Sequence, residues 1–433
     1  MITAHDMAPP GCTPPPLAFA GYRAPAPAAA AGFHERLLLI VLFVAVLASS
    51  IAFIEPSPHD GLMVLLAIVC VIAGVRIDRR LSLLLVLLLL FNAGGLLSLL
   101  NVPTKDQTVQ YAATSLYLAL AAMTFACLLA DNTMPRLETV TKAYVLSAVV
   151  AAIAGICGYF HAFPGAGDLF LLYGRAQGTF KDPNVYAPFL IWPTLIVLER
   201  MFVRRIGLLD LATVGILMLG LLLSFSRGAW FHFIVSCAVT IALLLLTAPS
   251  VGVRVRILGM CLIGLAAVAA FVALALSLDT VGHMFRERFH LFNSYDVGQG
   301  GRFRLQELAL GALLKYPNGM GPFEFSRVHG LQQHNVYLQA FLVYGWVGGM
   351  SYVVMLGATF MMALRTVFTA TPWRPYLITA FGTFVGEVIE GFVIDTDHWR
   401  HFFLLLGVIW GLGAATLRYR RHATERIGHV RTA

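Results

Sequence analysis

The sequence predicts an all-α polytopic membrane protein with about twelve transmembrane helices and one longer helical loop between them. Hydrophobic residues make up 59% of the 433 positions and charged residues 12%, and the mean hydropathy is +0.79. Such values are typical of membrane proteins and not of soluble domains. Long runs nearly free of charge recur, each close to the roughly 20 residues that a spanning helix needs. The expected spans are 37–54, 61–77, 81–100, 109–130, 138–160, 185–201, 207–225, 229–247, 256–278, 345–365, 375–394 and 401–417.

Residues 1–35 precede the first span and differ from it in composition. They are rich in Pro and Ala and show no apolar period, so we expect a disordered tail. The apolar run begins late and continues as a full span, which is not the pattern of a cleavable signal peptide.

The basic loops indicate how the helices are oriented. Those that alternate to share one side are 76–80, 199–205, 254–256 and 418–426. The positive-inside rule makes that side cytoplasmic, together with both termini. The net charge of +8 comes largely from these arginines, so it indicates membrane orientation and no nucleic-acid partner.

This orientation divides the chain into segments. Nine spans over 36–278 are followed by a long extracytoplasmic loop over 279–344, three further spans over 345–418 and a cytoplasmic tail over 419–433. Within the loop, apolar residues recur at helical spacing along 304–316, which predicts a short amphipathic helix lying on the bundle. Its apolar stripe consists of Leu305, Leu308, Ala309 and Ala312.

Several basic residues fall on the side opposite the basic loops. Because positive charge is normally kept on the cytoplasmic side, cations at the other end of the bundle indicate an anionic substrate. The alternative for each is a solvated or snorkelling side chain at the interface. These residues are Arg175, Lys181, Arg227, Arg302 and His334.

Local sequence explains how some of these side chains are presented. In "YGRAQGTFKDPN" (173–184), Asp182 can cap a helix whose first residue is Pro183. In "QHNVY" (333–337), Asn335 can cap the helix leading to the next span. His334 directly precedes that cap, so its backbone is fixed, which suits a positioned base.

Acidic residues near the last two spans offer other chemistry. Glu387 and Glu390 share a helical face inside or at the edge of a span, where ionisable residues are functional hypotheses by default. Asp395 and Asp397 form a D-x-D that could hold a divalent metal through oxygen ligands. Pairing of Asp395 and Asp397 with Arg400 or with the arginines of the cationic cluster is the simpler interpretation.

Four segments occur in order along the chain: "RAQGTFKDPN", "SFSRGAW", "GGRFRLQEL" and "YPNGMGPFEF…QHNVYLQAFLVYGWVGG". Together they resemble the O-antigen ligase family, which shares a domain with O-antigen polymerases and some bacterial protein O-oligosaccharyltransferases. The resemblance covers about 173–349 and the twelve-span layout.

The resemblance implies an inner-membrane glycosyltransferase of the C-type architecture whose catalytic loop faces the periplasm. Its donor would be a glycan on undecaprenyl diphosphate, and its acceptor a sugar of lipid A–core. Members are thought to invert the anomeric centre without a metal or other cofactor. By motif position, Arg227 and Arg302 would bind the diphosphate, Arg175 would assist and His334 would be the base. From the residues themselves, we expect Lys181 to join the diphosphate site and Asn335, Asp397 and Glu390 to support it.

General chemistry agrees with this assignment. A glycosyl diphosphate already carries a good leaving group, so it needs cations to stabilise the departing charge and no acid. Arginine binds phosphate oxygens bidentately and stays charged, and a histidine can take the acceptor proton near pH 7. A retaining mechanism would instead need a carboxylate nucleophile, for which Asp397 and Glu390 are the obvious supply.

Two other functions remain open at this stage. An O-antigen polymerase would use the same donor with a lipid-linked glycan as acceptor. A lipid-linked glycan transporter would place polar groups near the midplane of broken helices in repeated halves. The spans here are almost free of charge and show no internal repeat, which favours an enzyme.

Overall fold

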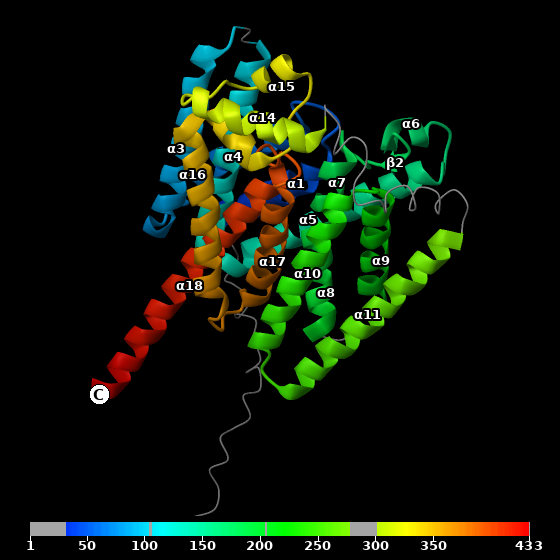
Figure 1. Cartoon of the computed structure of the whole chain (residues 1–433). Helices are drawn as coiled ribbons and strands as arrows, with labels where there is room; N and C mark the ends of the chain where they lie inside the picture. Colours follow the sequence, from blue (N-terminus) through cyan, green and yellow to red (C-terminus); the bar gives the residue numbers. More distant parts are fainter. Residues whose placement is uncertain (1–31, 104–105, 204–205, 278–300, 433) are drawn as a thin grey trace, which may run out of the picture.

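The computed structural model describes residues 32–103, 106–203, 206–277 and 301–432, and these are almost entirely helical (Figure 1). The expected tail over 1–31 and the first part of the long loop, 278–300, lie outside the described residues. Within the described part, nine helices are long and apolar enough to cross a membrane. The chain is therefore a polytopic membrane protein.

The helices follow the order expected from the sequence. The first half contains α1 (Phe33–Leu47), α2 (Pro58–Ile72), α3 (Ser82–Ser98), α4 (Asp106–Ala130), α5 (Thr133–Tyr159), α6 (Ala166–Phe170), α7 (Pro183–Phe189), α8 (Ile191–Val203) and α9 (Leu208–Leu223). The second half contains α10 (Arg227–Thr247), α11 (Val251–Ser277), α14 (Arg302–Lys315), α15 (Glu324–His329), α16 (Val336–Val367), α17 (Arg374–Glu390) and α18 (Arg400–Thr432). Two short strands, β1 (Leu171–Leu172) and β2 (Arg175–Ala176), form an antiparallel hairpin.

Each of the twelve expected spans falls on a helix, and nine of these reach spanning length in the described residues, α1 and α3 only together with adjoining 3-10 turns. Helices α2, α9 and α17 have 15, 16 and 17 residues, and the nine candidate spans do not include them. The expected span over 185–201 is divided between α7 and α8, which meet at Leu190. Pro188 and Pro193 flank this point and lack the amide donors that a continuous helix would use.

Both ends of the described chain are more helical than expected. Helix α1 already begins at Phe33, inside the segment assigned to the tail. Helix α18 continues to Thr432, through the segment where a cytoplasmic tail was expected from residue 419. That segment is rich in Arg and also contains Ala and Glu, which are good helix formers.

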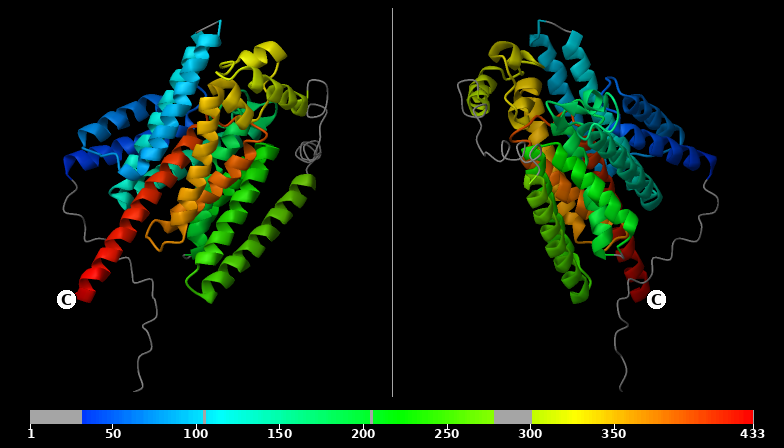
Figure 2. Two further views of the ribbon diagram at one scale, coloured as in Figure 1. Left: turned by 60° about the vertical axis from the view of Figure 1, so that its left-hand side comes forward. Right: turned by 90° about the vertical axis from the view of Figure 1, so that its right-hand side faces the viewer.

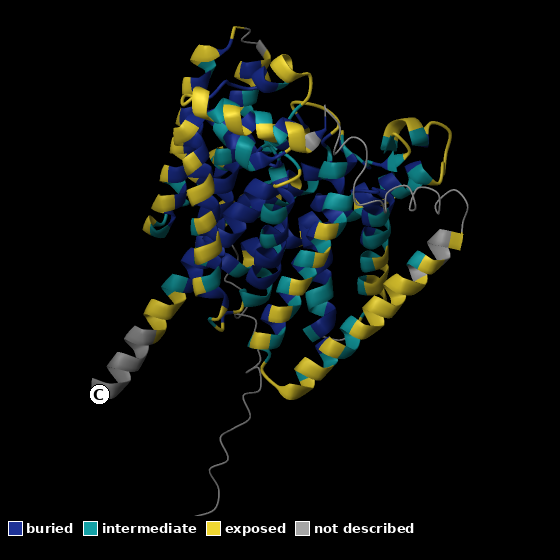
Figure 3. Ribbon diagram, viewed as in Figure 1, coloured by how far each residue is buried: buried dark blue, intermediate teal, exposed yellow. Residues whose placement is uncertain are grey.

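The bundle has two different ends. Helices α14 and α15 lie across one end, while the last turns of α18 project from the opposite end (Figure 1). Further views place α11 at the edge of the bundle (Figure 2). Helix α18 packs on α4, α3 on α16 and α10 on α17. Burial is greatest in α18 and over α7 and α8, whereas α11 is largely exposed (Figure 3).

The expected amphipathic helix is confirmed as α14. Leu305 and Ala309 from its apolar stripe are buried, and Leu308 and Ala312 are partly buried beside them. The stripe packs on a small cluster formed with Met320, Phe325 and Leu342. This packing places α14 on the start of α16, next to the end of the bundle where the basic residues were expected.

Helix α16 is broken at Gly345, which has a φ of 65°. The turn-rich loop 317–321 fills the break. The amides of Met320 and Gly321 donate to the carbonyl of Leu342, and the amide of Trp346 donates to the carbonyl of Pro317. Backbone groups freed by the break are thereby satisfied. The expected span therefore begins at a kink inside a longer helix.

Candidate active site

His334 stands directly before α16 in a left-handed backbone conformation, with a φ of 48°. Such a conformation is unfavourable for most side chains and persists where the surrounding structure holds it. Asn335 provides that support, because its side chain accepts hydrogen bonds from the amides of Tyr337 and Leu338 at 3.0 and 3.1 Å. The expected helix cap at Asn335 is confirmed.

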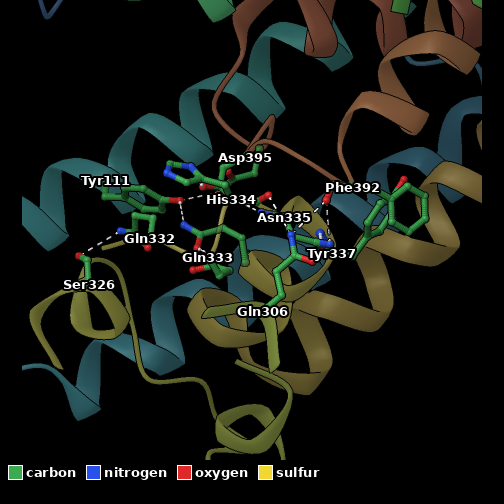
Figure 4. A network of polar contacts seen from close by, with 12 residues as sticks. Tyr111, Gln306, Ser326, Gln332, Gln333, His334, Asn335, Tyr337, Phe392 and Asp395 are labelled. Atoms are coloured by element: carbon green, nitrogen blue, oxygen red, sulfur yellow. Dashed lines mark hydrogen bonds and ion pairs between the residues drawn. The ribbon is translucent and has the colours of Figure 1, made fainter. Parts of the chain in front are cut away.

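Asp395 faces His334 from the loop between α17 and α18 (Figure 4). Its Oδ2 lies 3.6 Å from His334 Nδ1, an ion-pair distance and not a hydrogen bond. Its Oδ1 accepts from the amide of Asn335 at 2.9 Å. The Asp395 side chain is 19% exposed and the His334 side chain 46% exposed. One carboxylate therefore contacts both the ring of His334 and the backbone amide that follows it, while the ring stays accessible.

Burial raises the pKa of the Asp395 carboxyl above its ordinary value, and neighbouring Asp397 adds to this. His334 and the amide of Asn335 act in the opposite direction. A carboxylate in this position can orient an imidazole and stabilise the imidazolium that forms when the ring accepts a proton.

Helix α14 contacts the backbone around His334 through the side chain of Gln306. The Gln306 amide donates to the carbonyl of His334 at 3.4 Å and to that of Phe392 at 3.3 Å. The Asn335 side chain also donates to Phe392, at 3.2 Å (Figure 4). Arg302 begins α14 one turn before Gln306, and its side chain lies outside the described part. The start of α14 is thus joined to His334.

Asp397 lies deeper, and its carboxylate is engaged on several sides. It accepts from the Tyr111 hydroxyl at 2.5 Å and from the Tyr344 hydroxyl at 3.2 Å, and His398 Nδ1 lies 3.3 Å away. Burial works to raise the pKa of Asp397, but the charge and contact of His398 and the two hydroxyls outweigh it, so the pKa is lowered. These contacts fix the loop that carries Asp395 against α4 and α16.

The Arg175 side chain donates to polar groups at two helices, α9 and α7. Its Nε donates to the carbonyl of Ser224 at the end of α9, and its Nη2 donates to Asn184 in α7, both at 2.8 Å. The Ser226 hydroxyl donates to the same Asn184 oxygen at 2.9 Å. The expected cap is confirmed, because Asp182 accepts from the amide of Asn184 at 2.7 Å. Arg175 is therefore fixed beside the turn between α9 and α10.

Arg227 is the first residue of α10, directly after that turn. Gly228, its neighbour, packs so closely on α17 that a Cβ there would lie 2.9 Å from Glu390 Oε1. The carbonyl of Gly391, after Glu390, accepts from the amide of Val336 at 2.9 Å. Arg227 and His334 are thus both anchored to the same end of α17.

A comparison with protein families adds an identification to this geometry. Residues 212–353 match the family model described as O-antigen ligase. This part of the chain is an O-antigen ligase domain. Such a domain implies glycan transfer of the ligase or polymerase type and lipid-linked glycan substrates. A search of curated proteins returned no match to the chain.

The O-antigen ligase domain contains only part of the candidate site. Arg227, Arg302 and His334 lie within residues 212–353, whereas Arg175 and Asp395 lie outside them. The matched domain therefore receives groups from α7 and its preceding hairpin and from the loop after α17.

Other expected residues are placed differently. Lys181 pairs with Glu55 at 3.0 Å, and both side chains are about half exposed. The pair lines a cavity of about 220 Å³ on α1, α7 and the start of α18, together with Asp182. Lys181 is thus on a different contact surface from Arg175, which turns to Ser224 and Asn184.

The expected pairing of the D-x-D acids with Arg400 is wrong. Arg400 donates two hydrogen bonds to Asp60, at 2.8 and 2.9 Å, because the start of α18 faces α2. Asp395 and Asp397 turn to different partners, as described above. Among the residues that the structure describes, no group of three or more His, Cys, Asp and Glu is placed to hold a metal ion.

The two acidic side chains of α17 face different histidines. Glu390 Oε2 lies 2.8 Å from His232 Nδ1 of α10, whereas Glu387 Oε1 lies 3.4 Å from His401 Nε2 of α18. Sequence reasoning missed Asp395 as the partner of His334 and missed His232 altogether. The D-x-D was the only signal for the first, and a lone histidine within a span was the signal for the second.

Proposed function

We propose that this protein is an O-antigen ligase, which transfers a glycan from undecaprenyl diphosphate to a sugar hydroxyl of lipid A–core. The reaction would occur at the periplasmic face of a bacterial inner membrane, with both termini in the cytoplasm. The observation that carries the proposal is the His334–Asp395 pair, joined through the end of α17 to Arg227. A base and a phosphate-binding cation thereby share one end of the bundle.

In the proposed reaction His334 is the general base. Its Nδ1 faces Asp395, so its Nε2 is the nitrogen left to accept the proton of the acceptor hydroxyl. The acceptor oxygen forms a bond to the anomeric carbon of the donor sugar as the bond from that carbon to the diphosphate oxygen breaks. Asp395 stabilises the imidazolium formed in this step.

The diphosphate leaves with the electron pair of the broken bond. Arg227 at the start of α10, Arg175 in strand β2 and Arg302 at the start of α14 would bind its oxygens. Lys181 would join them after exchanging Glu55 for a phosphate oxygen. One such contact at about 4 Å is worth roughly 4 kcal/mol at an effective dielectric near 20, before desolvation costs.

A single displacement of this kind inverts the anomeric centre. The retaining alternative needs a carboxylate that can reach that carbon. Asp397 and Glu390, the candidates for that role, are 2% and 1% exposed and hydrogen bonded to other side chains. Their burial favours supporting roles and an inverting reaction, for which we propose that no metal is needed.

The architecture would be that of a C-type membrane glycosyltransferase. Helices α2, α9 and α17 would complete twelve crossings with the nine candidate spans. Residues 279–344 would form the periplasmic catalytic loop, with α14 and α15 on the periplasmic end of the bundle.

The test uses purified protein in nanodiscs with an undecaprenyl-diphosphate glycan, with and without lipid A–core. A lipid A–core band shifted by the glycan, and absent with His334→Ala, is the expected result. Lengthening of the donor without lipid A–core would instead make the protein a polymerase. Absence of product in both reactions, with glycan movement in a flipping assay, would support a transporter.

A further inference from the structure

Helices α10 and α17 pack against each other along a face of small and polar residues. Every fourth residue of α10 meets every fourth residue of α17 in antiparallel order. A Cβ at Gly382 would lie 2.1 Å from Thr240 Oγ1, and one at Gly386 would lie 2.3 Å from His232 Cδ2. The small residues let the two backbones approach closely. The interacting residues are Gly228, His232, Ser236 and Thr240 with Gly382, Gly386 and Glu390.

One ionisable pair closes this interface at the end that carries Arg227. His232 Nδ1 lies 2.8 Å from Glu390 Oε2, and the two residues are 0% and 1% exposed. His232 Nε2 lies 3.0 Å from the carbonyl of Thr383. A carbonyl only accepts, so Nε2 carries a proton and donates it.

This geometry fixes how the pair is protonated. With Nε2 as donor, His232 is either an imidazolium beside the Glu390 carboxylate or a neutral ring whose Nδ1 accepts from a protonated Glu390. In both cases one proton lies between Nδ1 and Oε2, and the pair has no net charge. It can therefore remain buried without an uncompensated charge.

The other oxygen of Glu390 faces the first turn of α10. Oε1 is the atom that a Cβ at Gly228 would approach to 2.9 Å, and Arg227 directly precedes Gly228. On the other side, Gly391 follows Glu390 and its carbonyl binds the first amide of α16, two residues after His334. Glu390 thus lies at the junction between the helix end of Arg227 and the helix end of His334.

We propose that His232 and Glu390 are a positioning pair that fixes Arg227 for the donor diphosphate. The inference rests on the proposed function, since it assigns a role toward the same donor. Neither side chain touches substrate. The shared proton holds the first turn of α10 against the end of α17, and Arg227 takes its place from that turn.

A neighbouring acid supplies a matched control. Glu387 lies on the same helix three residues earlier and is 0% exposed, but it faces His401 of α18 and not α10. Glu387→Gln changes a buried acid of α17 without touching the contact to α10. Gly311 of α14, whose Cβ would meet nothing within 4 Å, supplies the control for an added methyl group.

The experiment measures binding of undecaprenyl diphosphate to purified protein in nanodiscs, and the KM of donor and acceptor separately. Glu390→Ala and His232→Ala are expected to weaken diphosphate binding and to raise the donor KM by about 10- to 100-fold, as a misplaced binding group does. The acceptor KM should stay unchanged. Glu390→Gln should restore binding, because its amide can donate to His232 Nδ1.

A further variant tests the same contact without removing either member of the buried His232–Glu390 pair. Gly228→Ala places a methyl group against Glu390 Oε1 and should displace the first turn of α10, again raising the donor KM. Glu387→Gln and Gly311→Ala should keep the donor KM of the unaltered protein. The double variant His232→Ala/Glu390→Ala should be about as defective as either single variant, because one shared interaction is lost.

The outcomes separate the two levels of inference. If the unaltered protein transfers no glycan, the proposed function fails. If it transfers glycan but folded His232→Ala, Glu390→Ala and Gly228→Ala bind undecaprenyl diphosphate normally, the positioning role is refuted. Equal increases of donor and acceptor KM, or no rescue by Glu390→Gln, would also refute it by showing a general structural defect.

Discussion

Replacing Asp395 by asparagine separates its two contacts. In the unaltered protein the backbone amide of Asn335 donates to Asp395 Oδ1 at 2.9 Å. The side-chain oxygen of the new asparagine can still accept this hydrogen bond, so the start of α16 should keep its support. The charge beside His334 Nδ1 is lost. The substitution therefore removes the stabilisation of an imidazolium at His334 while leaving the local backbone in place.

The size of the effect follows from the separation of the two groups. At 3.6 Å, a pair of unit charges interacts by about 1.2 kcal/mol in bulk water and by about 4.6 kcal/mol at an effective dielectric of 20. His334 is 46% exposed, so solvent screening favours the lower half of this range. A loss of about 2 kcal/mol corresponds to roughly a 30-fold lower kcat.

The assay is glycan transfer at saturating donor and acceptor, measured across pH. Because burial raises the pKa of Asp395, its protonation should remove the stabilising charge at a pH above that for an ordinary aspartate. Activity of the unaltered protein should therefore fall as pH drops through this raised pKa. Asp395→Asn should lack this contribution to the acid limb.

Two results would refute this reasoning. A kcat within about twofold of the unaltered protein would show that the charge of Asp395 does not act on the reaction. An acid limb in Asp395→Asn that is identical to that of the unaltered protein would show that the Asp395 carboxyl is not the group that titrates there. Asp395→Ala, which also removes the contact to the Asn335 amide, should be more defective than Asp395→Asn.

Four further predictions can be measured in the same preparation. Arg302→Ala should abolish transfer in folded, inserted protein, and normal transfer would remove it from the diphosphate site. EDTA should leave transfer intact, whereas a loss restored by Mg²⁺ or Mn²⁺ would move the D-x-D acids to a metal site. Asn335→Ala should destabilise the start of α16 by about 1 kcal/mol and lower kcat, because the cap beside His334 is lost; thermal unfolding and transfer measure the two effects. Arg400→Ala should cost about 3 kcal/mol of stability, seen as a lower Tm. An unchanged Tm for Arg400→Ala would contradict the prediction.

The features that were correctly predicted depend on short stretches of sequence. The helix caps at Asp182 and Asn335 follow from side chains that bond to amides two or three residues away. The apolar stripe of α14 follows from helical periodicity within one segment. Both could be inferred because the interacting groups are close in the chain.

The partners of the site could not be inferred in this way. His334 and Asp395 are 61 positions apart, and His232 and Glu390 are 158 apart. Arg400 pairs with Asp60 and not with an acid of the D-x-D because the start of α18 packs against α2. Likewise, the break at Gly345 could be placed only once loop 317–321 was seen to satisfy its backbone groups.

By itself, the sequence determined that this is a multi-pass helical membrane protein with basic residues and a capped histidine near helix ends. Hydrophobic length, capping and helical periodicity are local properties, so they act before the helices pack. The tertiary structure alone decided which acid faces His334, which pair joins α10 to α17 and how Lys181 and Arg400 are paired. Those choices depend on which helix ends meet, and the packing of the whole bundle sets that.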